Sequence, residues 1–202
     1  MSSSLSFPYA SGERQLLRRE LRARRRQLST YQQRQAAHAL SRRLWQQPEI
    51  RQARHIALYW PADGEISPLH FARQAQARGH RLFLPVLMEF PQPHLRFARW
   101  QPGLRLRRNR FGIPEPASTP RRHARELDVI LLPLVGFDAQ GGRLGMGGGF
   151  YDRTLAFMQA RAKAGPRLLG LAHEAQRVDA LQQAPWDIPL QAVVSDRRCY
   201  RA

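Results

Sequence analysis

The chain has 202 residues, of which 43 % are hydrophobic, so it is long enough for one domain with a sizeable core. No stretch is long and apolar enough to cross a membrane, and residues 1–11 lack the basic start and apolar run of a secretory signal. The single cysteine, Cys199, excludes a disulfide framework within one chain. These features predict a cytoplasmic protein that does not associate with membranes.

The net charge is +18, and of the 33 basic residues only Lys163 is a lysine. Such a balance favours anionic partners, namely nucleic acid, nucleotides, or phosphorylated and polyglutamylated small molecules. Compositional bias of the source is the alternative explanation for the arginines.

Two helices are predicted at the start of the chain. Residues 13–28 repeat leucine at helical spacing and carry arginine on the remaining faces, which predicts a basic amphipathic helix. A second helix is expected over 31–47, where Ser29 or Thr30 can cap its start and Pro48 closes it.

The first predicted strand, 55–60, ends in the turn sequence 61–64. Glu65 follows that turn at the carboxyl end of the strand, where open α/β sheets place ligand contacts. Ser67 and Pro68 then form a helix start, and the helix is expected to run to about Arg78.

Two further strands are expected over 81–86 and 94–99. The next stretch, 101–120, is rich in proline and glycine and is predicted to be mostly loop. Within it, 111–116 is too proline-dense for a helix or a central strand. It either shapes one wall of a pocket or crosses the surface.

A short apolar run over 129–132 suits a strand that is buried on both faces. Seven of the fourteen glycines follow between residues 136 and 149, and a helix is expected from Phe150. A strand, a glycine loop and a helix start together present bare backbone N–H groups to an anion. Arg143 can grip phosphate, and Asp152 at the helix start could hold a metal beside it.

The chain closes with strands over 167–172 and 192–195, separated by a helix or turn over 173–183. Strands therefore alternate with helices, which predicts an α/β fold with a parallel-dominated sheet covered on both faces. We expect one domain over residues 13–202, preceded by a flexible tail over 1–12.

Covalent catalysis is not indicated by the sequence. The seven histidines show no metal-binding spacing, and neither a nucleophile elbow nor a Cys–His pair is present. Phosphoryl transfer by positioning and electrostatics is the better supported chemistry.

The stretch from Gly136 to Asp152, with its core GRLGMGGGFYD, resembles the signature of the 5-formyltetrahydrofolate cyclo-ligase family, also called methenyltetrahydrofolate synthetases. The similarity is to the bacterial type, and it extends to residues 14–21, 56–66, 82–86 and 112–116 and to the region of Asp187. The resemblance implies a three-layer α/β/α fold with a mostly parallel sheet, related in architecture to ribose-phosphate isomerases and CoA-transferases.

The same resemblance implies an ATP-dependent ligase that forms a C–N bond. The formyl oxygen of 5-formyltetrahydrofolate would attack the γ-phosphate of ATP, and nitrogen-10 would then displace phosphate from the activated carbon. The products would be 5,10-methenyltetrahydrofolate, ADP and phosphate. ATP would be the co-substrate and Mg²⁺ the cofactor.

The resemblance also implies roles for individual residues. Arg143 and Tyr151 would be catalytic, and Asp152 and Asp187 would hold Mg²⁺. ATP would be bound by Arg14, Arg18, Arg143, Leu144, Gly145, Met146, Gly147, Gly148, Gly149, Phe150 and Tyr151. The folate would be bound by Trp60, Glu65, Met146, Gly147, Gly148, Gly149 and Phe150. Arg14 stands where the family usually has lysine, which keeps the charge but changes its geometry.

Two alternatives stay open at this point. One is an arginine-rich nucleic-acid-binding protein, although aromatic residues are not interleaved with the basic run as a stacking platform requires. The other is a different ATP- or sugar-phosphate-using enzyme on the same fold. For the ligase we expect no obligatory nucleic acid and a monomer or weak homodimer.

Overall fold

The computed structural model describes residues 11–117, 120–159, 165–182 and 187–201. Its centre is an eight-stranded sheet. In spatial order the strands are β12 (Cys199–Arg201), β11 (Ala192–Ser195), β10 (Arg167–Ala172), β7 (Val129–Pro133), β1 (His55–Ala57), β2 (Arg81–Met88), β3 (His94–Trp100) and β6 (Arg121–Arg122). The pairs from β11 to β2 are parallel, whereas the pairs that add β12, β3 and β6 are antiparallel.

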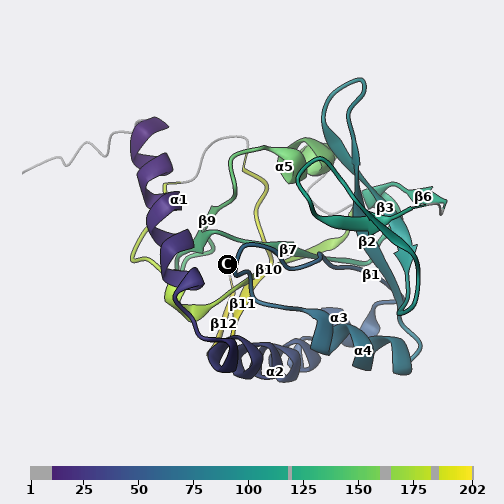
Figure 1. The fold of residues 1–202 in the computed structure, drawn as a ribbon, viewed down its shortest axis with the longest axis horizontal. Helices are drawn as coiled ribbons and strands as arrows, with labels where there is room; N and C mark the ends of the chain where they lie inside the picture. Colours follow the sequence, from purple (N-terminus) through teal and green to yellow (C-terminus); the bar gives the residue numbers. More distant parts are fainter. Residues whose placement is uncertain (1–10, 118–119, 160–164, 183–186, 202) are drawn as a thin grey trace, which may run out of the picture.

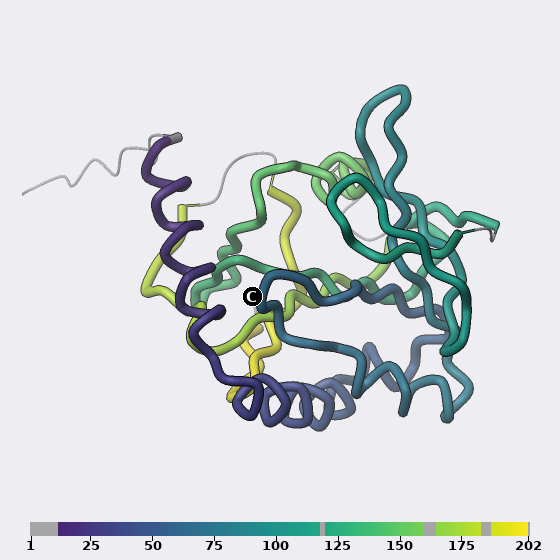
Figure 2. The backbone as a smooth tube through the Cα atoms, in the orientation of Figure 1, coloured from purple at the N-terminus to yellow at the C-terminus, as the bar shows by residue number. Residues whose placement is uncertain are grey.

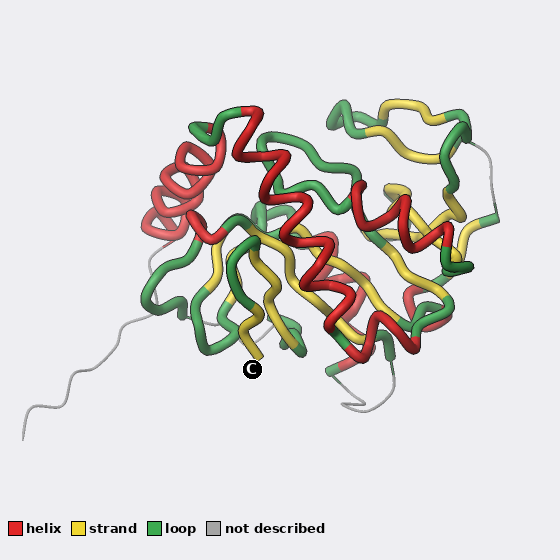
Figure 3. The backbone as a smooth tube through the Cα atoms, turned by 90° about the horizontal axis from the view of Figure 1, so that it is seen from below, coloured by secondary structure: helices red, strands yellow, loops and turns green. Residues whose placement is uncertain are grey.

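Helices cover both faces of this sheet, so the fold is the predicted three-layer α/β/α arrangement (Figure 1). One face carries α2 (Thr30–Gln46), α3 (Pro48–Gln52) and α4 (Leu69–Ala77), which cross the strands in Figure 3. The other face carries α5 (Phe150–Leu155) and the 3₁₀ turns η1 (Ala124–Glu126) and η2 (Ala156–Met158).

Strand β7 shows why the sheet is buried on both faces. Val129 and Leu131 pack into the core beneath α2 and α4, whereas Ile130 and Leu132 pack into the core on the α5 side. Successive side chains of a strand point to opposite faces, so a continuous apolar run contributes to two cores at once. The prediction of a doubly covered central strand is confirmed.

Several boundaries differ from those predicted. Pro48 follows the end of α2 as expected, but it also begins the separate helix α3, because proline is tolerated in a first helical turn. Strand β1 stops at Ala57, three residues earlier than predicted, although the N–H of Leu58 still donates to the backbone oxygen of Phe83 in β2 at 3.0 Å. The proline-rich stretch contributes β4 (Leu106–Arg108) and β5 (Pro114–Pro116), a small ribbon outside the main sheet.

The first helix, α1 (Ser11–Arg26), stands across the carboxyl ends of the parallel strands (Figures 1 and 2). It starts two residues before the expected domain boundary, and residues 1–10 of the expected tail lie outside the described residues. Leu21 packs against Val135 and Leu144, with Leu17 and Val178 at the edge of this cluster. The helix is therefore attached to the sheet by a small apolar contact of its own.

Replacing Leu21 with alanine tests that attachment. The Leu21 side chain has 0 % of its surface exposed. The change should lower the free energy of unfolding by about 2–5 kcal/mol, because it leaves a cavity in the cluster. Leu16 on the same helix is 56 % exposed. The matched variant Leu16→Ala should stay within about 0.5 kcal/mol of the parent in urea denaturation. Equal effects of the two substitutions would contradict this docking.

His173, directly after β10, is a buried histidine whose Nε2 has no hydrogen-bond partner within the described residues. Its backbone N–H donates to Gln176 Oε1 at 2.9 Å, at the start of η3 (Glu174–Gln176). Burial lowers the pKa of His173 to about 4, against the weaker opposing effects of Asp196 and the Gly64 backbone. The folded protein therefore holds this ring neutral at physiological pH.

Acidification should destabilise the fold through His173. Between its ordinary pKa of 6.5 and its folded pKa of about 4, the unfolded chain binds the proton and the folded chain does not. Stability is therefore lost as the pH falls through this window, by about 3 kcal/mol for this group. Denaturation at both ends of the window should give a shallower pH dependence for His173→Gln than for the parent. Parallel profiles would refute the assignment.

Candidate functional site

The predicted site residues gather at the carboxyl edge of the parallel strands, under α1. The chain leaves β1 for the turn 61–65, leaves β7 for the glycine-rich segment, and leaves β10 for His173. Open α/β sheets bind ligands at this edge, where loops leave neighbouring strands together. The location expected for Glu65 and the glycine segment is therefore the one observed.

The glycine-rich segment has two parts with different structures. Its first part is a hairpin of β8 (Gly136–Phe137) and β9 (Arg143–Leu144). Asp138 Oδ1 accepts the N–H groups of Gln140 and Gly142 at 3.0 and 2.7 Å and closes the hairpin. A Cβ on Gly142 would lie 2.3 Å from Asp138 Oδ2, so glycine is required there for space. Gly142 is thus required by the turn of the hairpin.

The second part, residues 145–149, is the candidate anion loop. Gly147 and Gly149 have positive φ angles of 90° and 65°, which favour glycine. Within the described residues, the N–H groups of Gly145, Gly147, Gly148 and Gly149 donate no hydrogen bond to a protein acceptor. Because α5 has only six residues, its dipole is small and free amides and arginines supply most of the positive potential.

The side chains of this segment differ in access. Leu144 is buried against α1, so only its backbone is available to a ligand, whereas the side chain of Met146 is exposed. Phe150 contacts Phe111 in an edge-to-face arrangement, with ring centroids 5.8 Å apart. The turn around Phe111 therefore lies beside the loop, which favours the pocket-wall interpretation of the proline-rich stretch.

Helix α1 brings two arginines to the loop. Arg18 Nε donates to the carbonyl oxygen of Gly145 at 2.9 Å, and Arg14 Nη2 lies 3.7 Å from Asp187 Oδ2. Burial and the charge of Arg14 lower the pKa of Arg18, and Asp187 opposes them. Like charges held this close attract a polyanion.

Arg143 and Asp152 form the second charged pair of the site. Arg143 is only 8 % exposed, and its Nη2 hydrogen-bonds Asp152 Oδ1 in the first turn of α5. The pair joins the end of the hairpin to the start of the helix and so encloses the loop between them. A guanidinium fixed by a carboxylate in this way is pre-oriented for a second anion.

The predicted folate residues lie around the turn 61–65. Glu65 Oε2 accepts the N–H of Ala62 at 3.0 Å, and its side chain is 12 % exposed. Trp60 lies against Trp100 with ring centroids 6.1 Å apart. Burial and the charge of Glu65 raise the pKa of Tyr151, so the phenol stays protonated. Tyr151 of α5 and Glu65 of the turn thus influence each other electrostatically across the site.

The predicted metal ligands, Asp152 and Asp187, are each paired with an arginine. Within the described ranges, no three side chains of histidine, cysteine, aspartate or glutamate cluster as a metal site. Two carboxylates still fit Mg²⁺, since that ion takes one or two protein carboxylates and completes its shell with phosphate oxygens and water. The donor chemistry is suitable, and the arginines would have to share these carboxylates with the ion.

Sequence reasoning missed Arg25, Asp63 and His173. Arg25 carried a usable signal, because it follows Leu17 and Leu21 at steps of four residues and so lies on the buried stripe of α1. The sequence around Asp63 indicated only a turn and gave no sign of its ion pairs. No sequence pattern separates His173 from the other histidines.

A separate cleft of about 650 Å³ opens at the opposite, amino-terminal edge of the sheet. Its lining includes Glu49, Asp128, Arg167 and Arg201. None of the residues predicted for ligand binding lines it.

No helix in the described part of the chain is long and apolar enough to cross a membrane.

Comparisons with known proteins agree on one family. The model of the 5-formyltetrahydrofolate cyclo-ligase family matches residues 10–196. The 5-formyltetrahydrofolate cyclo-ligase of Haemophilus influenzae is 40 % identical over 180 residues, covering 88 % of this chain and 95 % of that protein. The enzyme of the same name from Escherichia coli K12 is 39 % identical over 182 residues, covering 89 % and 98 %.

A solved structure agrees with this result. The 5,10-methenyltetrahydrofolate synthetase of Aquifex aeolicus superposes with a TM-score of 0.77 at 28 % identity, covering 93 % of this chain and 92 % of that one. The synthetase of Mycoplasma pneumoniae, at 24 % identity and a TM-score of 0.71, shares the fold over 91 % of this chain and 99 % of that one. The chain belongs to the 5-formyltetrahydrofolate cyclo-ligase family.

Proposed function

We propose that this chain closes the ring of 5-formyltetrahydrofolate at the expense of ATP, giving 5,10-methenyltetrahydrofolate, ADP and phosphate. The formyl oxygen attacks the γ-phosphorus and ADP leaves, which forms an iminium phosphate. Nitrogen-10 then attacks the activated carbon, and phosphate departs. Neither step needs a protein nucleophile, so the chain's contribution is orientation and charge stabilisation.

The observation that carries this proposal is the contact of α1 with the glycine loop. Arg18 holds the carbonyl oxygen of Gly145, so the unpaired amides of residues 145–149 lie beside the positive charges of Arg14 and Arg18. Amides and guanidiniums together suit the phosphates of ATP. Arg143 lies at the edge of the same loop, where it would neutralise charge that develops on the transferred group.

Glu65 is assigned to the folate, and Tyr151 is assigned to catalysis and to ATP. The carboxylate of Glu65 accepts N–H groups, which the pterin ring of a folate presents at its edge. The Tyr151 phenol, kept protonated by burial and by Glu65, donates a hydrogen bond between the two substrates. Trp60, which packs partly buried against the core, would supply an apolar wall for the folate.

Mg²⁺ would be held by Asp152 and Asp187 together with phosphate oxygens, and would neutralise charge on the transferred phosphoryl group. We place the reaction in the cytoplasm, and we assign the domain to residues 13–202 acting as a monomer or weak homodimer. The family assignment supports this ligase over a nucleic-acid-binding protein.

Arg18→Ala should raise the KM for ATP by about tenfold or more, because one charge-assisted contact to phosphate is lost. Arg19 is its exposed neighbour on α1 and serves as the matched control. Steady-state kinetics with varied ATP at saturating folate should show an unchanged KM for Arg19→Ala. Equal KM values for the two variants would exclude Arg18 as a phosphate ligand.

Arg143→Ala and Asp152→Asn should each lower turnover by about 100-fold or more, since both remove charge stabilisation near the transferred phosphoryl group. The measurement is growth of the methenyl absorbance band after mixing protein, 5-formyltetrahydrofolate and Mg-ATP, with ATP omitted as the control. Thermal melting confirms that each variant is folded. A protein that shifts labelled DNA or RNA at physiological salt but never forms the methenyl product would overturn the proposed function.

A further inference from the structure

Arg25 is an arginine without any exposed side-chain surface. It occupies the buried stripe of α1, one turn after Leu21, where a leucine would fill an ordinary amphipathic pattern. An isolated buried charge is costly, so an arginine in this position has to be compensated by fixed partners.

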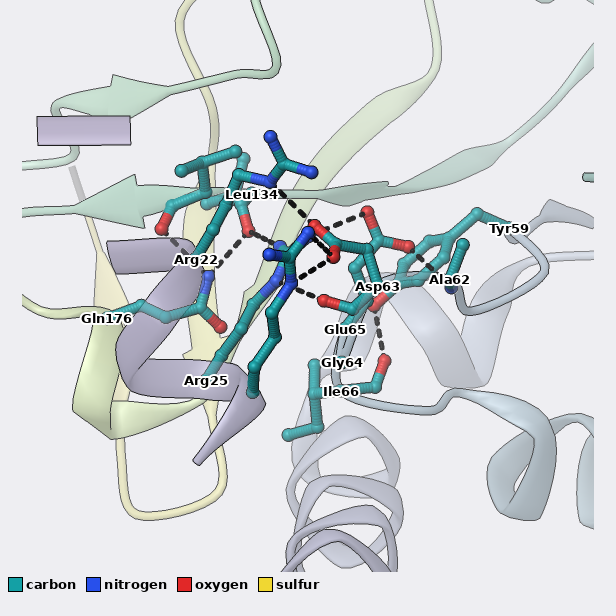
Figure 4. A network of polar contacts seen from close by, with 12 residues as sticks. Arg22, Arg25, Tyr59, Ala62, Asp63, Gly64, Glu65, Ile66, Leu134 and Gln176 are labelled. Atoms are coloured by element: carbon teal, nitrogen blue, oxygen red, sulfur yellow. Dashed lines mark hydrogen bonds and ion pairs between the residues drawn. The ribbon is translucent and has the colours of Figure 1, made fainter. Parts of the chain in front are cut away.

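Those partners come from two segments that are far apart in the chain (Figure 4). Arg25 Nε donates to the backbone oxygen of Asp63 at 2.8 Å, and Nη2 donates to Asp63 Oδ2 at 2.9 Å. Nη1 donates to the backbone oxygen of Leu134, just after β7, at 3.3 Å. Gln176 donates to the same oxygen at 2.8 Å. The guanidinium therefore ties α1 both to the turn after β1 and to the end of β7.

Asp63 does not depend on Arg25 alone. Arg22 Nε donates to Asp63 Oδ2 at 2.6 Å, and Arg26 hydrogen-bonds Oδ1. Burial acts to raise the pKa of Asp63, but the hydrogen bonds from these arginines outweigh it, so the pKa lies below its ordinary value. Without Arg25, two arginines would still hold this carboxylate against α1.

Glu65, unlike Asp63, has no second arginine within ion-pair distance among the described residues. Its Oε1 lies 3.8 Å from Arg25 Nη2, and Arg25 is the only cation within ion-pair distance of it among the described residues. The other charged and titratable groups that act on or respond to this carboxylate are Asp63 of its own turn, Arg22 of α1, Tyr59 after β1 and Tyr151 of α5. Arg25 is thus the group that couples the helix to Glu65.

We propose that Arg25 is a positioning residue for substrate, which fixes the turn 61–65 and keeps the Glu65 carboxylate aimed at the folate. The inference rests on the role of Glu65 in the proposed function. Arg25 touches neither substrate, because its guanidinium is enclosed by Asp63, Leu134 and Glu65.

The geometry of the turn supports this role. Asp63 and Gly64 both have positive φ angles, 51° and 75°. Non-glycine residues adopt this conformation only at a cost, so the surrounding contacts have to hold it. A Cβ on Gly64 would lie 3.3 Å from the Arg25 backbone oxygen, which shows how closely the helix and the turn approach. Moving Arg25 therefore moves the segment that carries Glu65.

The test compares Arg25→Met with Arg22→Met. Arg22→Met removes one hydrogen bond to Asp63. Arg25→Met removes two hydrogen bonds to Asp63 and one to Leu134, and only this change removes the ion-pair partner of Glu65. Arg25→Met should raise the KM for 5-formyltetrahydrofolate by about tenfold or more while changing the KM for ATP much less. Arg22→Met should leave the folate KM within about twofold of the parent. Equal folate KM values for the two variants would overturn the proposal.

The pH profile adds a readout that a purely structural role would not change. Burial already raises the pKa of Glu65, and the Ala62 N–H and the charge of Arg25 oppose it. Loss of that cation raises the pKa of Glu65 further, so the acidic limb of kcat/KM for the folate should move to higher pH in Arg25→Met. An unmoved limb would contradict the coupling.

A double-mutant cycle separates this inference from the proposed function. Glu65→Gln should itself raise the folate KM, and in that background Arg25→Met should add little. If Glu65→Gln has no effect, the proposed folate contact and the inference both fail. If Glu65→Gln is impaired and Arg25→Met multiplies the defect independently, only the positioning role fails.

Arg25→Lys covers the case in which Arg25→Met does not fold, as judged by thermal melting. Lysine retains the charge but cannot reproduce the three-acceptor geometry. It should raise the folate KM while leaving the acidic limb close to that of the parent. A parental folate KM in this variant would overturn the proposal.

Discussion

The attachment of α1 to the turn 61–65 through Asp63 is the interaction on which the site depends. Three arginines of one helix face a single carboxylate, and one of them is fully buried. A buried charge is costly unless it is paired and hydrogen-bonded, and each of the three guanidinium nitrogens of Arg25 donates to an acceptor of Asp63 or Leu134. The apolar packing of Leu21 stabilises the docked helix but is not directional, whereas these hydrogen bonds set the position of the helix.

This attachment links the two halves of the site. The first half of α1 presents Arg14 and Arg18 to the glycine loop, and its last turns contact the segment that carries Glu65. The helix is a single rigid element, so a shift at one end would be felt at the other. Positioning of this kind suits a reaction in which two substrates must meet and no protein nucleophile takes part.

The glycine segment shows that one composition signal can serve two structural purposes. Its early glycines allow the Asp138 hairpin to close, and its later glycines leave amides unpaired beside the arginines. The sequence analysis assigned ligand contacts to the later glycines and gave the earlier ones no separate role. It did not predict the hairpin, because the hairpin forms through hydrogen bonds to Asp138, which glycine spacing does not reveal.

The sequence by itself determined the central strands, the order of helices and strands, and the region of the site. Apolar runs and helical periodicity indicate which residues are buried, and both are patterns of residues that are close together in the sequence. Only the tertiary structure decided that Arg25 is hydrogen-bonded to Asp63 and Leu134 and that Arg143 pairs with Asp152. Such facts depend on contacts between separate segments of the chain. An arginine on one face of a helix is solvated, whereas an arginine on another face is enclosed by neighbouring segments.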